Sequence, residues 1–351
     1  MIVVAYNSQK FTSFVLSLLL LCVVVFPSLW SETALATERG EITGGASHTL
    51  PAWFKDSFLD IADDVEEAND EDRHVMLFFH LTNCPYCNRM LNESFETDPL
   101  KSTIQDNFDV IVINVKGDRD VAFTDEISVS EKVLAEQLNV FATPAIMFLN
   151  NDNKAVARVD GYRAPARFKQ VLSYVSEKAY ANNTTFKDYL DKNLDREVYT
   201  LRDNPAFSAT KNLSVIKGPL MVIFEDGTCH DCPEFHDKVL SHQDVATEMK
   251  LYTVVRLDTG SKQAIIDTEG NETTATAMAE DLNMTFRPGV AIYDEGKLVN
   301  RIDSLLYSFH FKEGLRYISG GYYKAEKYRI YAEKRREALL SAGVSINLGN
   351  E

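Results

Sequence analysis

The sequence has few cysteines and no excess of positive charge. Cysteine accounts for 5 of the 351 residues, and 36 Lys and Arg stand against 52 Asp and Glu, for a net charge of −16. A negative field repels phosphate backbones and anionic lipid heads, which argues against nucleic acid as a partner. Hydrophobic residues make up 45% and charged residues 25% of the chain. These are ordinary globular values, so a wholly disordered or fibrous chain is excluded.

Long hydrophobic runs are also scarce, because the chain has only one, from Phe14 to Phe26. Pro27 ends the run, and Ala34-Leu35-Ala36 provides a small-x-small cleavage site. This order predicts a secretory signal peptide over residues 1–36, with an uncleaved anchor as the alternative. The run is shorter than the ~20 residues that a spanning helix needs. We therefore expect an exported protein, periplasmic or secreted with a bacterial periplasm favoured, without stable membrane insertion after cleavage.

The four cysteines that follow the leader form two tight pairs rather than a scattered framework. They read Cys84-Pro85-Tyr86-Cys87 and Cys229-His230-Asp231-Cys232. A disulfide across two intervening residues closes a very short loop and removes little chain entropy, so a stabilising role is a poor explanation. The pairs indicate thiol chemistry or metal binding.

Both pairs belong to an internal repeat. Each follows an apolar run typical of a central strand, His74–His80 in the first copy and Leu220–Phe224 in the second, and each is followed by a helical pattern. The later prolines keep this offset to within one residue, since Cys229 lies 145 positions after Cys84 and Pro288 lies 144 after Pro144. This predicts an α/β protein with two tandem domains, each a mixed central sheet with helices on both faces.

The predicted organisation has five parts. These are the signal peptide 1–36, a first domain 37–178, a connector 179–214, a second domain 215–320, and a C-terminal helix and tail 321–351. Within the connector we expect a short helix over 186–194, and both a mobile tether and a packed linker remain open. The basic segment 322–340 is expected to dock against its own acidic chain, with a partner-binding helix as the alternative.

The repeated unit resembles the thioredoxin fold, over roughly residues 52–178 and 215–320. Strand, CxxC at a helix start, a distant X-Pro before a strand and a closing β-β-α occur in the required order. The first copy is similar to periplasmic thioredoxins of the SoxW-like type, through Asn83–Met90 and Ala142–Ala145. The second copy diverges more, with Arg287 in place of the Thr before the proline.

The resemblance implies a role for each residue of the motif. Cys84, at a helix N-terminus that stabilises a thiolate, would attack a substrate disulfide, and the less exposed Cys87 would resolve the mixed disulfide. Pro85 fits the first helical turn, and Tyr86 would cover the sulfurs. Thr143 and a cis Pro144 would support the site in the first copy. In the second copy Cys229 would be the nucleophile and Cys232 the resolving cysteine. The supporting residues there would be His230, Asp231, Arg287 and a cis Pro288.

Two departures from thioredoxins affect the expected chemistry. Phe78 and Ile223 replace the buried acid, so His80 and Glu225 are possible substitutes, with solvent-facing strand ends as the alternative. His230 and Arg287 favour a thiolate at Cys229, whereas Asp231 opposes it. On this count the second pair is the more oxidising, and electrons would move from the first pair to the second.

The predicted function is an exported thiol–disulfide oxidoreductase that reduces or isomerises protein disulfides, with no cofactor beyond its two disulfides and no metal. Its expected partners are disulfide-containing proteins and a membrane thiol electron donor. One alternative is a non-catalytic binding or chaperone module. The others are zinc bound by the four cysteines and a copper-handling site at His230, His236 and His242, which we otherwise interpret as surface histidines.

Overall fold

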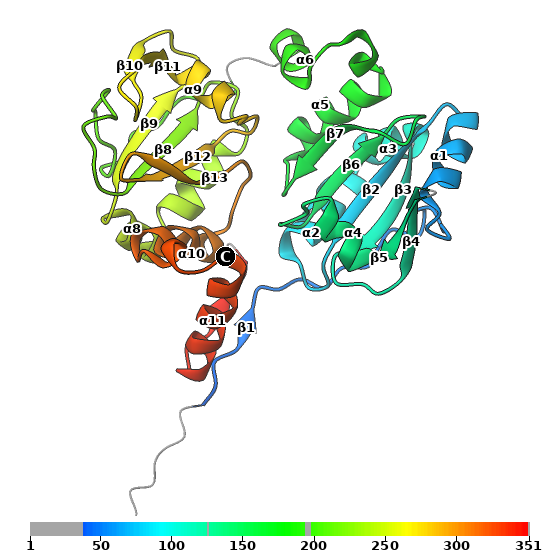
Figure 1. The fold of residues 1–351 in the computed structure, drawn as a ribbon, viewed down its shortest axis with the longest axis horizontal. Coiled ribbons are helices and arrows are strands. Elements are labelled where there is room, and N and C mark those ends of the chain that lie inside the picture. Colours follow the sequence, from blue (N-terminus) through cyan, green and yellow to red (C-terminus); the bar gives the residue numbers. More distant parts are fainter. Residues whose placement is uncertain (1–37, 125, 194–197, 350–351) are drawn as a thin grey trace, which may run out of the picture. The chain divides into compact units, whose positions relative to one another are not determined.

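The computed structural model describes residues 38–124, 126–193 and 198–349. The predicted signal peptide therefore lies outside the described residues. The described chain contains two four-stranded mixed sheets, ordered β3-β2-β6-β7 and β9-β8-β12-β13 (Figure 1). In each sheet the first two strands are parallel and the others antiparallel, which is the predicted repeat.

The first domain forms around β2, which is buried along almost its whole length. Phe78 and Met76 face one hydrophobic core, and Leu77 and Phe79 face the other, because successive side chains on a strand alternate. Its elements are α1 (Ile61–Asp70), β2 (His74–His80), α2 (Pro85–Met90), η1 (Leu91–Phe95), α3 (Leu100–Asn107), β3 (Phe108–Asn114), β4 (Asp120–Thr124), β5 (Ile127–Ser130), α4 (Glu131–Gln137), β6 (Ala145–Leu149), β7 (Ala155–Asp160) and α5 (Pro165–Ser176).

The second domain repeats this order from β2 onward, around β8, whose residues are all buried. Met221 and Ile223 face one core, and Val222 and Phe224 face the other. Its elements are β8 (Leu220–Glu225), α7 (Cys232–Glu234), η3 (Phe235–Leu240), α8 (Gln243–Met249), β9 (Thr253–Asp258), β10 (Ala264–Ile266), β11 (Glu272–Thr274), α9 (Ala275–Asp281), β12 (Gly289–Asp294), β13 (Lys297–Ile302) and α10 (Ser308–Ser319).

The two copies share details that hydrophobic periodicity does not reveal. In each, the helix after the CxxC continues as a π-helix, η1 or η3. In each, a short antiparallel hairpin, β4–β5 or β10–β11, precedes the next helix. The Thr143–Pro144 and Arg287–Pro288 peptide bonds are cis, as predicted, and Asp98–Pro99 is also cis.

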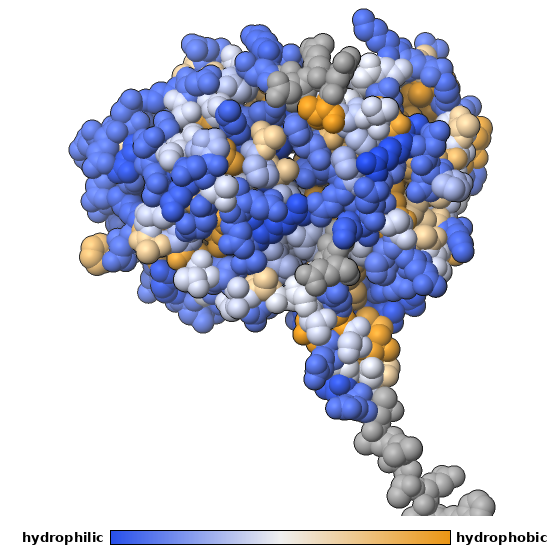
Figure 2. Space-filling model, turned by 180° about the vertical axis from the view of Figure 1, so that it is seen from behind, coloured by the Kyte–Doolittle hydropathy of each residue, from blue (hydrophilic) through white to orange (hydrophobic). Residues whose placement is uncertain are grey.

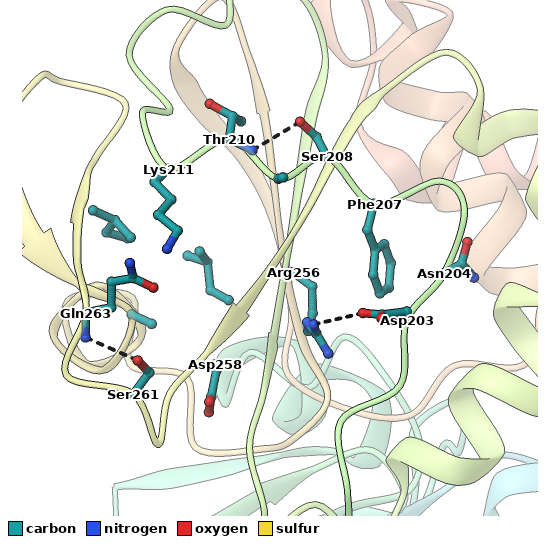
Figure 3. Close-up of a pocket in the computed structure, with 14 residues that line it drawn as sticks. Asp203, Asn204, Phe207, Ser208, Thr210, Lys211, Arg256, Asp258, Ser261 and Gln263 are labelled. Carbon is teal, nitrogen blue, oxygen red and sulfur yellow. Dashed lines mark hydrogen bonds and ion pairs between the residues drawn. The ribbon is translucent and has the colours of Figure 1, made fainter.

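The described connector contains η2 (Ala179–Asn182) and α6 (Phe186–Asn193), and its later part packs along the edge of the second sheet. The Ser208 amide donates to the Val254 carbonyl at 2.7 Å, and the Leu213 amide donates to Ile266 at 2.8 Å. Beside these anchors, residues of the connector and of β9 line an open cavity of about 460 Å³, where Asp203 pairs with Arg256 (Figure 3). Residues 203–213 thus form a packed linker, and no CxxC residue lines this cavity.

The ends of the described chain pair with each other. Beyond η4 (Tyr322–Lys324), α11 (Tyr328–Ser341) leads to β14 (Ile346–Asn347), which pairs in parallel with β1 (Ile42–Thr43). Tyr331 of α11 is buried and donates to the Glu313 carboxylate at 2.9 Å, so this basic helix docks on its own acidic chain.

The face in Figure 2 is largely hydrophilic, and its hydrophobic residues lie in separate small patches. No helix in the described part of the chain combines the length and apolar character needed to cross a membrane.

Candidate functional site

The first CxxC motif lies where β2 ends and α2 begins. Cys84 is the N-cap residue of α2, with Pro85 in the first turn. Cys84 and Cys87 form a disulfide, and the Cys87 amide donates a hydrogen bond to the Cys84 sulfur at 3.1 Å. Free amides of a first turn stabilise negative charge, so the reduced Cys84 sulfur is placed to exist as a thiolate.

The loop before Pro144 contacts this disulfide through Thr143. The Thr143 hydroxyl donates to the Cys84 sulfur at 3.4 Å, and the Thr143 carbonyl oxygen lies 3.5 Å from that sulfur. The hydroxyl is a second donor for a thiolate at Cys84. The structure therefore brings together the first-copy residues that the sequence predicts.

The first disulfide is less accessible than the sequence suggests. Cys84 is 5% exposed and Cys87 is fully buried, whereas we expect an exposed Cys84 from the motif alone. Tyr86 packs in the same core and stacks on Tyr307 of the second domain, with ring centroids 4.2 Å apart. Its hydroxyl accepts from the Tyr307 amide at 2.7 Å and lies 3.1 Å from Nδ1 of His310. Tyr86 thus joins the two domains.

A second polar contact joins the helices that follow the two motifs. Arg89 donates to both carboxylate oxygens of Glu234, each at 2.8 Å. The same guanidinium lies over the ring of Tyr162, 4.2 Å from its centroid. A guanidinium that donates to both oxygens of one carboxylate forms a stronger ion pair than one that makes a single contact. The described chain forms one compact unit that includes both domains. No pattern in the sequence indicated these contacts between the domains.

The second CxxC motif has a different local structure. Helix α7 begins at Cys232, so Cys229 lies outside it, in the turn that follows β8. The prediction that Cys229 occupies a helix N-terminus is therefore wrong. The reason is the place of proline: Pro85 follows the first cysteine of its motif, but Pro233 follows the second. Proline favours the first turn of a helix, so α7 begins two residues later relative to its motif than α2 does.

The connector covers this second disulfide. Cys229 is 1% exposed and Cys232 is fully buried, and both pack against Tyr199, with Leu201 alongside. The Tyr199 amide also donates to the Gly227 carbonyl at 3.1 Å. This cover was not predicted, because no pattern in the sequence relates an isolated tyrosine of a connector to a motif beyond it.

Arg287 does not act as expected. Its guanidinium pairs with Asp226 at 3.2 Å and donates to Thr259, and it also donates to the carbonyls of Met284 and Phe286. The paired carboxylate offsets the positive charge that we expected to stabilise a thiolate at Cys229.

Asp231 is nearly buried within the second motif, at 4% exposure. Burial raises its pKa to about 7, and the charges of Arg89 and Arg163 pull it down only in part. Asp231 is thus partly protonated near neutral pH and opposes a neighbouring thiolate less than a full negative charge would. His230 is half-buried beside it.

The expected substitutes for the buried thioredoxin acid differ in their surroundings. Glu225 is fully buried, 2.7 Å from Nε2 of His236, and its other oxygen has no hydrogen-bond partner. A solvent-facing Glu225 and a surface His236 are therefore both wrong. His80 is half-buried and lies 3.0 Å from Nε2 of His48, and burial lowers its pKa to about 4.

The residues proposed for metal binding have other roles in the structure. Each cysteine pair is a disulfide, His236 bonds to Glu225, and His242 accepts the Asp244 amide as the N-cap of α8. Within residues 38–124, 126–193 and 198–349, no group of three His, Cys, Asp or Glu side chains is arranged to hold a metal ion.

Known proteins resemble the chain one domain at a time. The most similar solved structures include a thioredoxin-fold protein from Helicobacter pylori (17% identity, 38% of this chain and 89% of that one, TM-score 0.32). A thioredoxin from Thermus thermophilus has 26% identity over 35% of this chain and 89% of its own, with a TM-score of 0.29. The C-terminal domain of DsbD from Neisseria meningitidis has 17% identity over 33% and 88%, with a TM-score of 0.24. No curated protein matches the chain.

The family model described as a thioredoxin-like domain matches the chain twice, over residues 61–176 and 207–319. The two matches together cover more than half of the sequence and coincide with the two sheets and their helices. The chain therefore belongs to the thioredoxin-like domain family and carries two copies of that domain.

Proposed function

We propose that the protein is an exported thiol–disulfide oxidoreductase that reduces or isomerises disulfides in other proteins. The observation that carries this proposal is the position of Cys84. Its sulfur caps α2, accepts the Cys87 amide and faces Thr143 beside a cis proline. These are the donors that a nucleophilic thiolate needs.

The reaction requires both cysteines of the first motif. The Cys84 thiolate attacks one sulfur of a substrate disulfide, forms a mixed disulfide and releases the other sulfur as a thiolate. Cys87 then attacks Cys84, closes the Cys84–Cys87 bond and releases the second substrate sulfur, so two electrons pass to the substrate. The carbonyl of Thr143 faces Cys84 and offers the backbone on which an extended substrate segment would pair.

Catalysis in an oxidising compartment also needs a source of electrons. We propose a membrane thiol protein as the donor and a bacterial periplasm as the location, in line with the leader-like first 36 residues and the SoxW-like first motif. Localisation of the processed chain by cell fractionation tests the second point.

Reduction of insulin by dithiothreitol provides the test of the activity. The protein should accelerate precipitation of the insulin B chain, and Cys84→Ser should abolish the acceleration. The variant Lys169→Gln, which changes an exposed residue of α5, is the control and should retain the acceleration. Equal rates with the Cys84→Ser variant and the unmodified protein would refute the proposal.

The second domain supports a further candidate role, as a binding module without turnover. Its disulfide is covered by Tyr199 of the connector, and its nucleophile position lacks a helix N-terminus. Insulin reduction by the Cys84→Ser/Cys87→Ser variant separates the two roles: a measurable rate supports a second catalytic pair, and its absence supports the binding module.

A further inference from the structure

The open cavity of about 460 Å³ lies beside β9, the outer strand of the second sheet. Connector residues between 203 and 211 form one part of its wall, and residues 256–258 of β9 form another (Figure 3). The volume lies in the ~300–1,000 Å³ range of small-molecule sites. None of the residues that line it is a cysteine, so a ligand bound there has a role separate from thiol exchange.

The connector leaves part of the β9 edge uncovered. The Val254 carbonyl points outward and accepts the Ser208 amide at 2.7 Å. Peptide groups alternate between the two edges of a strand, so Arg256 turns its N–H and C=O outward as Val254 does. The next backbone bond of the connector passes to β10, where the Ile266 amide donates to the Lys211 carbonyl at 2.8 Å. The peptide groups of Arg256 therefore face the cavity.

Two charged side chains of the wall have no ionic partner. Arg256 pairs with Asp203, but no carboxylate lies within ion-pair distance of Lys211 in the part of the chain that the structure describes. Among the same described residues, no cation lies within that distance of Asp258, whose carboxylate accepts the Gly260 amide at 2.8 Å. The cavity thus offers one positive group, one negative group and an uncovered strand edge.

We propose that this cavity binds a short peptide with free termini, whose carboxylate pairs with Lys211 and whose ammonium group pairs with Asp258. Between its two ends, the peptide backbone pairs with Arg256 as an added strand. Phe207 and Ile265, also in the wall, offer apolar contact for one side chain. A ligand without net charge is not repelled by a chain of net charge −16. The inference goes beyond the proposed redox function and does not depend on it.

Calorimetric titration of the oxidised full chain with the tripeptide glycyl-valyl-glycine tests the site. The free tripeptide should bind with a dissociation constant below about 1 mM. Its C-terminal amide lacks the carboxylate, and its N-acetyl derivative lacks the ammonium group. Each derivative should bind about fivefold more weakly than the free tripeptide, because it loses one ion pair at a partly exposed position.

Variants of the two charged residues assign each end of the ligand. Lys211→Gln should weaken binding of the free tripeptide about fivefold and leave the affinity of the amide unchanged. Asp258→Asn should weaken binding of the free tripeptide and leave the affinity of the N-acetyl derivative unchanged. Lys262→Gln removes an exposed charge outside the wall, and this matched control should bind all three ligands as the unmodified protein does. Because Lys211 is exposed, its variant should fold normally.

A second comparison tests the pairing with β9. Methylation of both peptide nitrogens of the tripeptide removes the donors that a strand edge requires, and it should weaken binding at least about fivefold. Free valine carries both charges but has no peptide bond, so it should bind more weakly than the tripeptide. Equal affinities for valine and the tripeptide would overturn the strand pairing.

The remaining outcomes decide the inference without reference to the cysteines. Failure of the free tripeptide to bind at about 10 mM would overturn it. Binding that both Lys211→Gln and Asp258→Asn leave unchanged would place the peptide elsewhere on the chain and overturn it as well. None of these results bears on insulin reduction, so the proposed function is decided by its own test.

Discussion

Folding changes the protonation of Asp231, which lies between the two cysteines of the second motif. Its pKa rises from 3.8 to about 7 because it is buried. Between these values the folded chain binds more protons than the unfolded chain, so the free energy of unfolding falls as pH rises through this window. Above about pH 7 the buried carboxylate is charged, and the full cost is present.

Asp231→Asn should remove this cost. We expect the variant to gain stability over the unmodified protein by up to about 4 kcal/mol above pH 7, with the gain disappearing below about pH 4. Denaturant unfolding at a series of pH values measures it. Asp237→Asn, which changes an exposed carboxylate on η3, is the control and should show little pH-dependent gain. A constant difference at all pH values would contradict the argument.

At the scale of single residues, the sequence was sufficient to predict the arrangement of the first motif but not that of the second. Cys84, Pro85, Thr143 and Pro144 lie together because strand, motif and proline come in a fixed order. The sequence contained the signal that shifts the second helix, since Pro233 follows Cys232, but analogy with the first motif obscured it. The partner of Arg287 depends on how two loops meet, which residue order alone does not determine.

The starts of α2 and α7 lead to a different order of potentials from the one expected. Cys84 caps its helix, whereas Cys229 lies three residues before α7, and Asp226 offsets the charge of Arg287. A more stable thiolate makes a more oxidising pair. The geometry therefore favours the first pair as the more oxidising, with electrons passing from the second pair to the first.

Glutathione-buffer titration of the two single-pair variants measures this order. Cys229→Ser/Cys232→Ser should report a potential at least about 30 mV above that of Cys84→Ser/Cys87→Ser, which corresponds to about 1.4 kcal/mol. Potentials in the reverse order would restore the expectation from sequence and show that His230 outweighs the helix start.

The connector controls access to the second disulfide. Tyr199 packs against both cysteines, and its hydroxyl accepts the Arg202 amide at 3.3 Å. Tyr199→Ala removes the covering ring, so dithiothreitol should reduce Cys229–Cys232 at least about tenfold faster in a Cys84→Ser/Cys87→Ser background. Tyr199→Phe keeps the ring and should react at the original rate. Equal acceleration in both variants would assign the effect to the hydroxyl instead.

At the scale of the molecule, side chains beside the two CxxC motifs join the two domains. Tyr86→Phe keeps the ring that stacks on Tyr307 but leaves the Tyr307 amide without its acceptor. We expect a loss of about 1–3 kcal/mol in the free energy of unfolding, because a buried donor loses its partner. Tyr322→Phe, whose side chain is more exposed, is the control and should change little. An unchanged Tyr86→Phe stability would show that the domains do not dock through this hydroxyl.

Contacts of this kind mark the limit of prediction at the scale of the molecule. Periodicity and the repeat predicted two mixed sheets, because each strand and helix carries its own pattern of burial. The Arg89–Glu234 and Tyr86–Tyr307 contacts join residues more than a hundred positions apart and depend on how two complete surfaces fit.

The central claim is that Cys84 attacks substrate disulfides and Cys87 resolves the product. Trapping with Cys87→Ser tests it most directly, because a mixed disulfide that cannot be resolved should accumulate. After incubation with a disulfide-containing protein, mass spectrometry should find Cys84 joined to the substrate in this variant. Cys84→Ser should form no comparable adduct through Cys87. An adduct through Cys87 but not Cys84, or none in either variant, would contradict the account.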